Sequence, residues 1–277
     1  MKKKIALVAM AAAAVCAQAA DWSDTSLAYT TGTNYKEPYV AGGDTIAKNI
    51  YTLKNVSGDK YGQNFFAADL LQSGGNDESA QEVYAVYRRL FDLEKITGKK
   101  YAYGPVKDMG VTVGFDFNTK NSSYSSKKRM LVAGPTWMID VKQGFFDVSL
   151  LALSESNDPS SASSVRYGYS TGRYAYKTHA DLSMAWGVPT GITNLSFEGR
   201  ADYIDSKGKS EGGADTKPES YFYGSLMYDV SAPVGAAKNT FKLGAGYEYW
   251  KNKFGNDAST VPGAFAKTPF VKAEYHF

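Results

Sequence analysis

Three observations predict that this chain folds as an all-β protein, a transmembrane antiparallel up-and-down β-barrel of about twelve strands. Apolar and polar side chains alternate along most of the sequence, which is the pattern of strands that present two different faces. The chain begins with a leader typical of secretion. The connections between predicted strands alternate between long and short, as expected of a sheet that closes on itself with both termini at one end.

The last stretch, residues 265–277, shows the alternation clearly. In a membrane barrel its apolar face would contact lipid and its polar face the lumen. In a secreted soluble β protein, which is the alternative, the apolar face would enter a core. A terminal aromatic also resembles the signal by which bacterial outer-membrane barrels are recognised, so we expect the barrel assembly machinery to bind Phe277. The two faces are Phe277, Tyr275, Ala273 and Val271 against His276, Glu274, Lys272 and Phe270.

Residues 1–19 have the order of a signal peptide: three lysines, an apolar run and a small-residue Ala-Gln-Ala site. The apolar run is too short to span a bilayer as a helix. We expect cleavage after Ala19, which leaves residues 20–277 as the outer-membrane barrel domain. Cleavage also removes Cys16, the single cysteine, so the mature chain has no thiol or disulfide chemistry.

The charge of the mature chain is balanced. The whole sequence has 31 Lys and Arg against 28 Asp and Glu, and the leader contains three of the lysines, so 28 of each sign remain. A nucleic-acid partner needs excess positive charge and is therefore disfavoured. After the leader, no stretch approaches the roughly 20 apolar residues of a transmembrane helix.

Twelve segments carry the strand pattern. Alternate residues of a strand share a face, so we call odd or even position in the sequence the parity of a residue. In residues 195–203 every charge falls on the even parity, which gives Glu198, Arg200 and Asp202 a common face. In residues 82–93 both faces contain an arginine, and we place Arg88 inside because it shares its parity with acidic neighbours. The predicted strands are residues 21–31, 46–54, 61–71, 82–93, 110–118, 128–141, 145–154, a strand ending at 186, 195–203, 221–230, 241–250 and 265–277.

The connections mostly alternate in length, as a barrel with both termini in the periplasm requires. One connection disagrees: residues 94–107 are long on the side that should be short, and we expect an extra turn of structure there. The long connections are residues 31–45, 72–81, 154–169, 205–217 and 252–264; the short ones are 57–60, 142–144 and 188–192, and 231–239 is intermediate.

Aromatic side chains gather at one predicted height. On descending strands Trp137, Trp186, Tyr275 and Phe277 arrive near the periplasmic end with outward parity. Amphipathic rings favour the headgroup level of a membrane. These patterns together predict a location in the outer membrane of a Gram-negative bacterium, with lipid and lipopolysaccharide around the outer face.

Several segments of the mature chain are familiar: DWSDTSLAY, YGQNFFAADLL, EVYAVYRR, GPVKDMGVTVGFDFNTK, GFFDVSLLALSES and FAKTPFVKAEYHF. They resemble the Tsx-like family of nucleoside-specific outer-membrane channels, especially its divergent branch often labelled outer envelope protein. The resemblance implies a monomeric twelve-stranded barrel with a narrow pore that admits nucleosides, and phage binding at extracellular loops in some members. The family's nucleoside-contacting residues do not align with particular positions here, so none is transferred.

The inward parities give a set of candidate channel-lining and substrate-binding residues. Aromatic faces stack a base while charged groups hydrogen-bond sugar hydroxyls, so the set favours a channel for passive diffusion of small solutes, nucleosides first. In the alternative, structural interpretation, charges on neighbouring strands neutralise one another and tyrosines fill space. The set is Arg88, Asp116, Glu198, Arg200, Asp202, Tyr221, Tyr223, Lys242, Glu248, Trp250, Lys272 and Glu274.

Two other functional classes stay open. A barrel lipase would use a hydroxyl nucleophile with a histidine base, but His179 and His276 lack a recognisable partner motif. A structural or phage-receptor barrel would have a plugged lumen and contacts in loops such as residues 205–217. No metal or cofactor is expected, because the acidic loop residues are best interpreted as solvated charge: Asp77, Glu78, Asp158 and Asp257.

Overall fold

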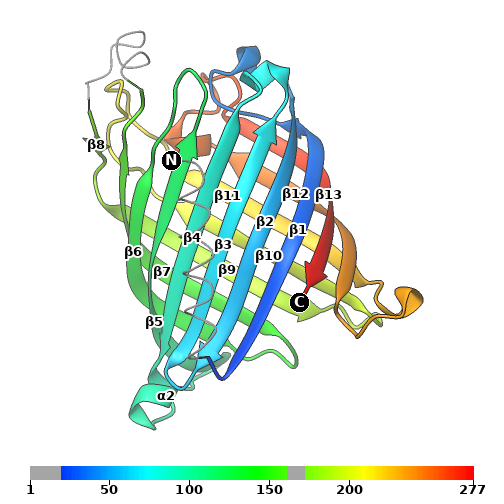
Figure 1. Cartoon of the computed structure of the whole chain (residues 1–277). Helices are drawn as coiled ribbons and strands as arrows, with labels where there is room; N and C mark the ends of the chain where they lie inside the picture. Colours follow the sequence, from blue (N-terminus) through cyan, green and yellow to red (C-terminus); the bar gives the residue numbers. More distant parts are fainter. Residues whose placement is uncertain (1–19, 161–171) are drawn as a thin grey trace.

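The computed structural model describes residues 20–160 and 172–277. They form a closed antiparallel barrel of twelve long strands in sequence order (Figure 1), which confirms the predicted fold class. The predicted signal peptide and residues 161–171 lie outside the described residues. The long strands are β1 (Trp22–Tyr35), β2 (Ile46–Asp59), β3 (Gly62–Ser73), β4 (Gln81–Asp92), β5 (Val106–Lys120), β6 (Arg129–Ile139), β7 (Phe145–Asn157), β9 (His179–Pro189), β10 (Leu195–Ile204), β11 (Glu219–Asp229), β12 (Phe241–Lys251) and β13 (Phe265–His276); β8 (Tyr174–Ala175) is a short addition beside β7.

The barrel closes where its first and last strands pair. Ser26 lies opposite His276 and Ala28 opposite Glu274, and the register continues along β1 and β13. The backbone N–H of Phe277 donates to the carbonyl of Thr25 at 3.0 Å. The C-terminal strand is therefore the element that removes both free edges of the sheet, and with them the unpaired backbone groups that an open edge would expose.

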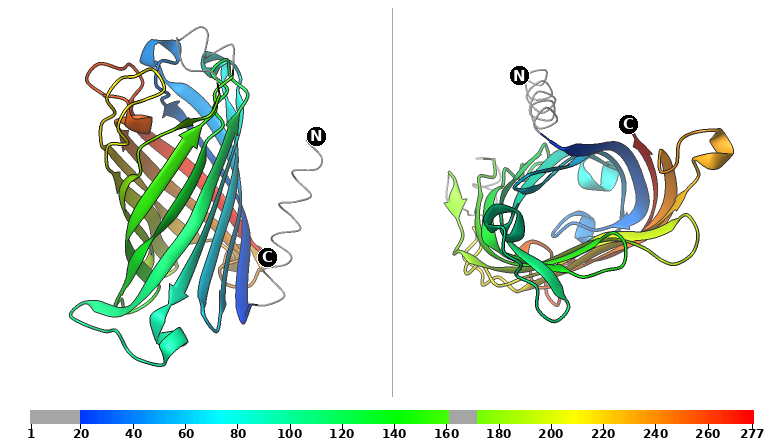
Figure 2. Two further views of the ribbon diagram at one scale, coloured as in Figure 1. Left: turned by 90° about the vertical axis from the view of Figure 1, so that its left-hand side faces the viewer. Right: turned by 90° about the horizontal axis from the view of Figure 1, so that it is seen from below.

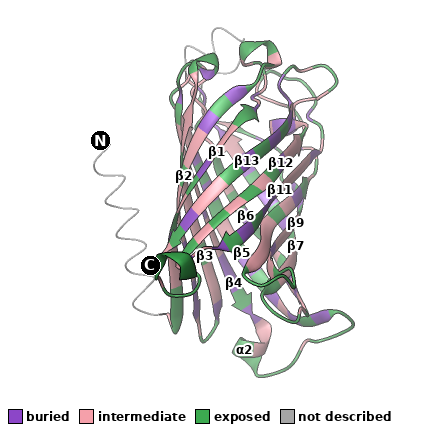
Figure 3. Ribbon diagram, turned by 90° about the vertical axis from the view of Figure 1, so that its right-hand side faces the viewer, coloured by how far each residue is buried: buried purple, intermediate pink, exposed green. Residues whose placement is uncertain are grey.

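The two faces of the sheet are inverted relative to a soluble protein. Outward side chains are large and apolar yet exposed, with exposed fractions of 65% for Leu131, 56% for Val271 and 52% for Leu243. Inward side chains are often charged yet buried, such as Asp116 and Glu274. Buried and exposed residues accordingly alternate along the ribbons (Figure 3). No helix within residues 20–160 and 172–277 is long and apolar enough to cross a membrane.

The two ends of the barrel differ. We call the end that contains Phe277 and the start of β1 the proximal end, and the opposite end, with the longer connections, the distal end (Figures 1 and 2). The connection between β4 and β5, which is longer than expected of a periplasmic turn, contains helix α2 (Leu93–Thr97) at the proximal end. Asp92 caps the helix by accepting from the Lys95 N–H at 2.9 Å, and Gly98 ends it with φ of 71°.

Outward aromatic rings pack against one another in small groups on the outer face. Trp186 lies on the outer face near the end of β9, with ring centroids 5.4 Å from Phe197 and 5.8 Å from Phe222. Tyr275, near the end of β13, contacts the ring of Phe277 at 5.0 Å. Neighbouring strands thus bring aromatic side chains from β9, β10 and β11 into contact on the outer face.

Candidate functional site

The inner surface of the barrel brings the sequence-predicted candidates together. Residues directly opposite in an antiparallel ladder share a face. Arg200 lies opposite Tyr223, which lies opposite Glu248, and Lys242 lies opposite Glu274. Following the register around the barrel places all twelve candidates on the inner face: Arg88 on β4, Asp116 on β5, Glu198, Arg200 and Asp202 on β10, Tyr221 and Tyr223 on β11, Lys242, Glu248 and Trp250 on β12, and Lys272 and Glu274 on β13.

Four rings line one side of the interior, and we call them the aromatic wall. The ring of Tyr223 stacks on Phe270, with centroids 4.6 Å apart and planes at 14°. Tyr221 meets Trp250 edge to face at 4.9 Å. Phe270 was not among the predicted candidates, although its inward parity was evident. Tyr221, Tyr223 and Trp250 remain partly exposed, whereas Phe270 is 3% exposed.

Two arginines reach the middle of the interior from opposite sides. Arg88 pairs with Asp116, which also accepts from the Tyr84 hydroxyl at 2.5 Å. Arg200 pairs with Asp202 at 3.0 Å, and its guanidinium lies 4.9 Å from the centre of the Tyr221 ring. The Arg200 side chain is still 44% exposed while that of Asp202 is 5% exposed. The guanidinium of Arg200 therefore borders open space inside the barrel.

A cluster around Glu274 lies nearer the proximal end. The Glu274 carboxylate is fully buried and accepts from Lys54 at 2.6 Å and Ser26 at 3.0 Å. Lys272 lies 2.6 Å and the His276 ring 3.1 Å from the same carboxylate. Neighbouring strands thus neutralise one another here, as the structural interpretation of these charges proposed. Lys242 and Glu198 form a similar pair at 2.9 Å.

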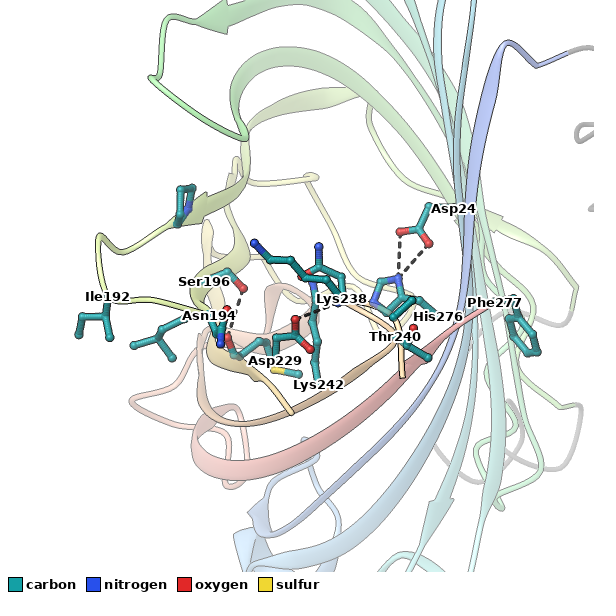
Figure 4. Close-up of a pocket in the computed structure, with 15 residues that line it drawn as sticks. Asp24, Ile192, Asn194, Ser196, Asp229, Lys238, Thr240, Lys242, His276 and Phe277 are labelled. Atoms are coloured by element: carbon teal, nitrogen blue, oxygen red, sulfur yellow. Dashed lines mark hydrogen bonds and ion pairs between the residues drawn. The ribbon is translucent and has the colours of Figure 1, made fainter. Parts of the chain in front are cut away.

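A cavity of about 660 Å³ opens at the proximal mouth. Its lining includes Asp24, Lys242 and His276, so it is the entrance to the interior rather than a separate site. Figure 4 shows the His276 ring turned toward the Asp24 carboxylate, to which Nδ1 lies at 2.9 Å, while Phe277 points away from both.

The distal mouth is crossed by charged connections, which we call the distal network. Lys253, in η4 (Lys253–Gly255), is 3% exposed, donates to the carbonyl of Lys36 at 2.9 Å and pairs with Glu37 at 3.2 Å. Glu37 also pairs with Lys48 of β2. Lys207, from the connection after β10, pairs with Glu155 of β7 at 2.9 Å. Ion pairs thus fix three connections over the mouth.

Phe254, the middle residue of η4, is fixed by contacts of its backbone and its ring. The Phe254 N–H and the Trp250 indole N–H both donate to Glu219, at 2.9 Å and 3.0 Å. The ammonium of Lys128 lies 4.2 Å from the centre of the Phe254 ring. Phe254 has a φ of 59°, which is uncommon for a residue with a bulky side chain, so the contacts hold this turn in a strained conformation.

The distal network makes the free energy of unfolding depend on pH in the acidic range. Burial alone would raise the pKa of the Glu37 carboxyl, but Lys253 and Lys48 outweigh burial and hold the pKa well below its usual range. Glu37 therefore stabilises the fold above its unfolded pKa of 4.5, and this contribution is lost as the pH falls below that value toward the folded pKa.

We expect Glu37→Gln to lower the free energy of unfolding at pH 7 by about 1–3 kcal/mol, because two buried ammonium groups lose their partner. The loss of free energy stays within this range because the connections can open locally and let water reach the two ammonium groups. The difference from wild type should narrow as the pH is lowered from 4.5 to 3. Urea titrations in detergent micelles at several pH values measure it, and a difference that stays constant over this range contradicts the role given to Glu37.

Both histidines and one acidic loop residue contact neighbouring polar groups. His179 Nδ1 lies 2.9 Å from the carbonyl of Lys177, and His276 contacts carboxylates. For Asp77 the interpretation as solvated charge is wrong, because the residue is 1% exposed and pairs with Lys120 at 2.6 Å. Among the described residues, no three His, Cys, Asp or Glu side chains are grouped so as to hold a metal ion.

Several inward groups were not among the predicted candidates. Lys54, Asp69, Tyr84 and Asp181 lie on the inner face by the same register. Parity was a sufficient signal for each of them, since Asp69 alternates with outward apolar neighbours and Asp181 precedes outward Leu182. Parity does not give the strand register, however, and only the register shows which of these side chains contact one another.

The chain was compared with protein families, curated proteins and solved structures. No family model and no curated protein matches it. Similar solved structures include the KdgM porin (8% identity, TM-score 0.42, covering 91% of this chain and 99% of the porin) and the translocator domain of the autotransporter NalP from Neisseria meningitidis (11%, 0.44, 100% and 98%). The COG4313 outer membrane channel from Pseudomonas putida F1 is another (12%, 0.46, 92% and 95%). These scores give no ground for transferring a function.

Proposed function

We propose that this chain is an outer-membrane channel through which small polar solutes diffuse passively. The observation that supports the proposal is the inversion of the sheet faces. A soluble monomer rarely exposes an apolar surface of more than a few hundred Å², whereas here large apolar side chains are exposed on the outer face of every long strand. A lipid bilayer would cover this face, and the charged inner face would border water.

The proximal end would then lie in the periplasm and the distal end outside the cell. A single-chain barrel with an even number of strands has both termini at one end, and short turns face the periplasm in such barrels. The connection between β2 and β3 at the proximal end is only two residues long. The distal network would then meet solutes first.

Nucleosides are the solute class that we propose. A nucleoside combines a flat base with a sugar rich in hydroxyl groups. The aromatic wall supplies ring faces for the base, and the charged groups beside it, such as Glu248 opposite Tyr223, supply partners for the hydroxyls. Stacking one base on an aromatic ring is worth about 1–3 kcal/mol. Such a contact holds a solute briefly and lets it leave.

Liposome swelling tests the proposal. Purified protein in liposomes should admit a nucleoside faster than a sugar of equal size. Equal rates would contradict the nucleoside preference and leave the channel in place. Absence of swelling with every solute would contradict the channel itself.

The aromatic wall provides a sharper prediction. Changing both Tyr221 and Tyr223 to Ala should raise the nucleoside concentration that half-blocks the ion current by about tenfold, because stacking one base on an aromatic ring is worth about 1–3 kcal/mol. The measurement is current block in a planar bilayer. The double Phe variant keeps the ring faces and should retain block, and Tyr247→Ala on the outer face should not change it. Unchanged block in the double Ala variant removes both tyrosines from the site.

A second candidate is a receptor barrel with a closed lumen. The distal network favours it, since three connections are tied across the mouth by buried ion pairs. The swelling experiment separates the two candidates, because a closed barrel admits neither nucleosides nor sugars.

A further inference from the structure

Five inward carboxylates surround one arginine in the middle of the barrel. All five lie within electrostatic range of Arg200. They come from five strands on both sides of the interior, so they enclose the passage rather than line one wall. We call them the carboxylate ring: Asp69 of β3, Asp116 of β5, Asp181 of β9, Asp202 of β10 and Glu248 of β12.

The carboxylate ring has more negative than positive charge. Arg88 pairs with Asp116, and Arg200 pairs with Asp202. The other three carboxylates form no ion pair with any Lys, Arg or His in the described parts of the chain, although Asp69 accepts a hydrogen bond from Thr52 at 2.6 Å. Two guanidinium groups therefore face five carboxylates. The lysines nearest Asp69 and Glu248 are already paired elsewhere, Lys272 with Glu274 and both Lys48 and Lys253 with Glu37.

Two members of the ring have an acceptor atom with no donor. Glu248 is 8% exposed and Asp181 is 6% exposed, and Glu248 Oε1 and Asp181 Oδ1 receive no hydrogen bond from the described residues. A buried carboxylate oxygen without a donor is costly, so a polar group must reach it from the interior. Water, an ammonium group or a guanidinium group satisfies this need, and an anion does not.

The space beside these oxygens is open. Arg200 belongs to the same group of charges and is 44% exposed, so solvent-sized molecules reach the centre of the ring. The geometry does not suit a chelated metal, because no three of these acids converge on one point. A mobile cation that passes along several separated carboxylates fits better.

We propose that the carboxylate ring makes the channel selective for cations and is a transient binding site for small organic cations that carry an ammonium group. Rings of Asp and Glu select cations in other channels because they replace part of the charge stabilisation that water gives the ion. The proposal rests on the channel function proposed above and narrows its solutes to neutral and cationic ones. It predicts that nucleosides pass and that their phosphorylated, anionic forms are disfavoured.

Ion currents in a planar bilayer test this proposal. Under a tenfold KCl gradient at pH 9, the reversal potential of the wild type should show a several-fold preference for K⁺ over Cl⁻. The variant Asp69→Asn, Asp181→Asn, Glu248→Gln should lose this preference, because Arg88 and Arg200 remain. Arg200→Gln should strengthen it, and Asp215→Asn, in an exposed ion pair with Lys209, should leave it unchanged.

Current block provides a second measurement on the unaltered protein, in case the triple variant does not fold. We expect 1,4-diaminobutane to block the wild-type current at lower concentration than 1,4-butanediol, a neutral molecule of the same size. Conducting channels with no cation preference, or equal block by the two molecules, would overturn the carboxylate ring while leaving the channel function intact. Purified protein that never conducts would overturn both.

Discussion

Glu274→Gln is expected to lower the free energy of unfolding by about 3 kcal/mol, near the low end of the range for breaking a buried ion pair. The carboxylate joins three strands at the closing seam, with Lys54 from β2, Ser26 from β1 and Lys272 from β13. Its removal leaves two ammonium groups and the His276 ring without their common partner. Lys54 is 23% exposed to the interior, so water recovers part of the loss.

Urea titration in detergent micelles measures this loss. The matched control is Asp215→Asn, which breaks an exposed pair and should change the free energy of unfolding by no more than about 0.5 kcal/mol. Adding Lys272→Gln to Glu274→Gln should cost less than the two single changes together, because the second change removes one of the stranded charges. A Glu274→Gln protein as stable as the control would show that the seam does not depend on this cluster.

The fold could be predicted from sequence because the signal is local. A strand of a membrane barrel alternates every second residue, so each segment carries its own record of which face is apolar. Residues 195–203 show this, with every charge on one parity and every charge on the inner face in the structure. Strand ends were harder, since β1 continues to Tyr35 and β2 to Asp59 through polar residues that give no alternation.

The candidate site was only partly predictable, because parity assigns a face but not a partner. Glu274 meets Lys54, a residue far away in sequence, only because the first and last strands are neighbours in the closed barrel. Arg200 lies within electrostatic range of Asp116 across the interior, and that proximity depends on the register of every strand between them. The distal network was beyond prediction, since connections such as the one containing Glu37 have no periodicity to read.

If lipid surrounds the outer face, a charged side chain placed there should lower the free energy of unfolding by an amount that depends on its depth in the bilayer. Leu150 lies at the middle of β7, points outward and is 46% exposed. Leu150→Arg should lower the free energy of unfolding from lipid vesicles by about 2–4 kcal/mol, the cost of a cationic side chain at the bilayer midplane. Ser154→Arg, four residues farther along the same face, should cost only about 0–1 kcal/mol, because it lies near the interface.

The comparison between these two variants isolates the environment from the side chain, since strand, face and substituent are the same. Urea titrations of both proteins in vesicles of one lipid composition measure it. In water, both positions would be solvent-exposed and both arginines would be nearly neutral in effect. Equal small effects in vesicles would therefore show that no bilayer surrounds this face, and the channel, the aromatic wall and the carboxylate ring would lose their common physical basis.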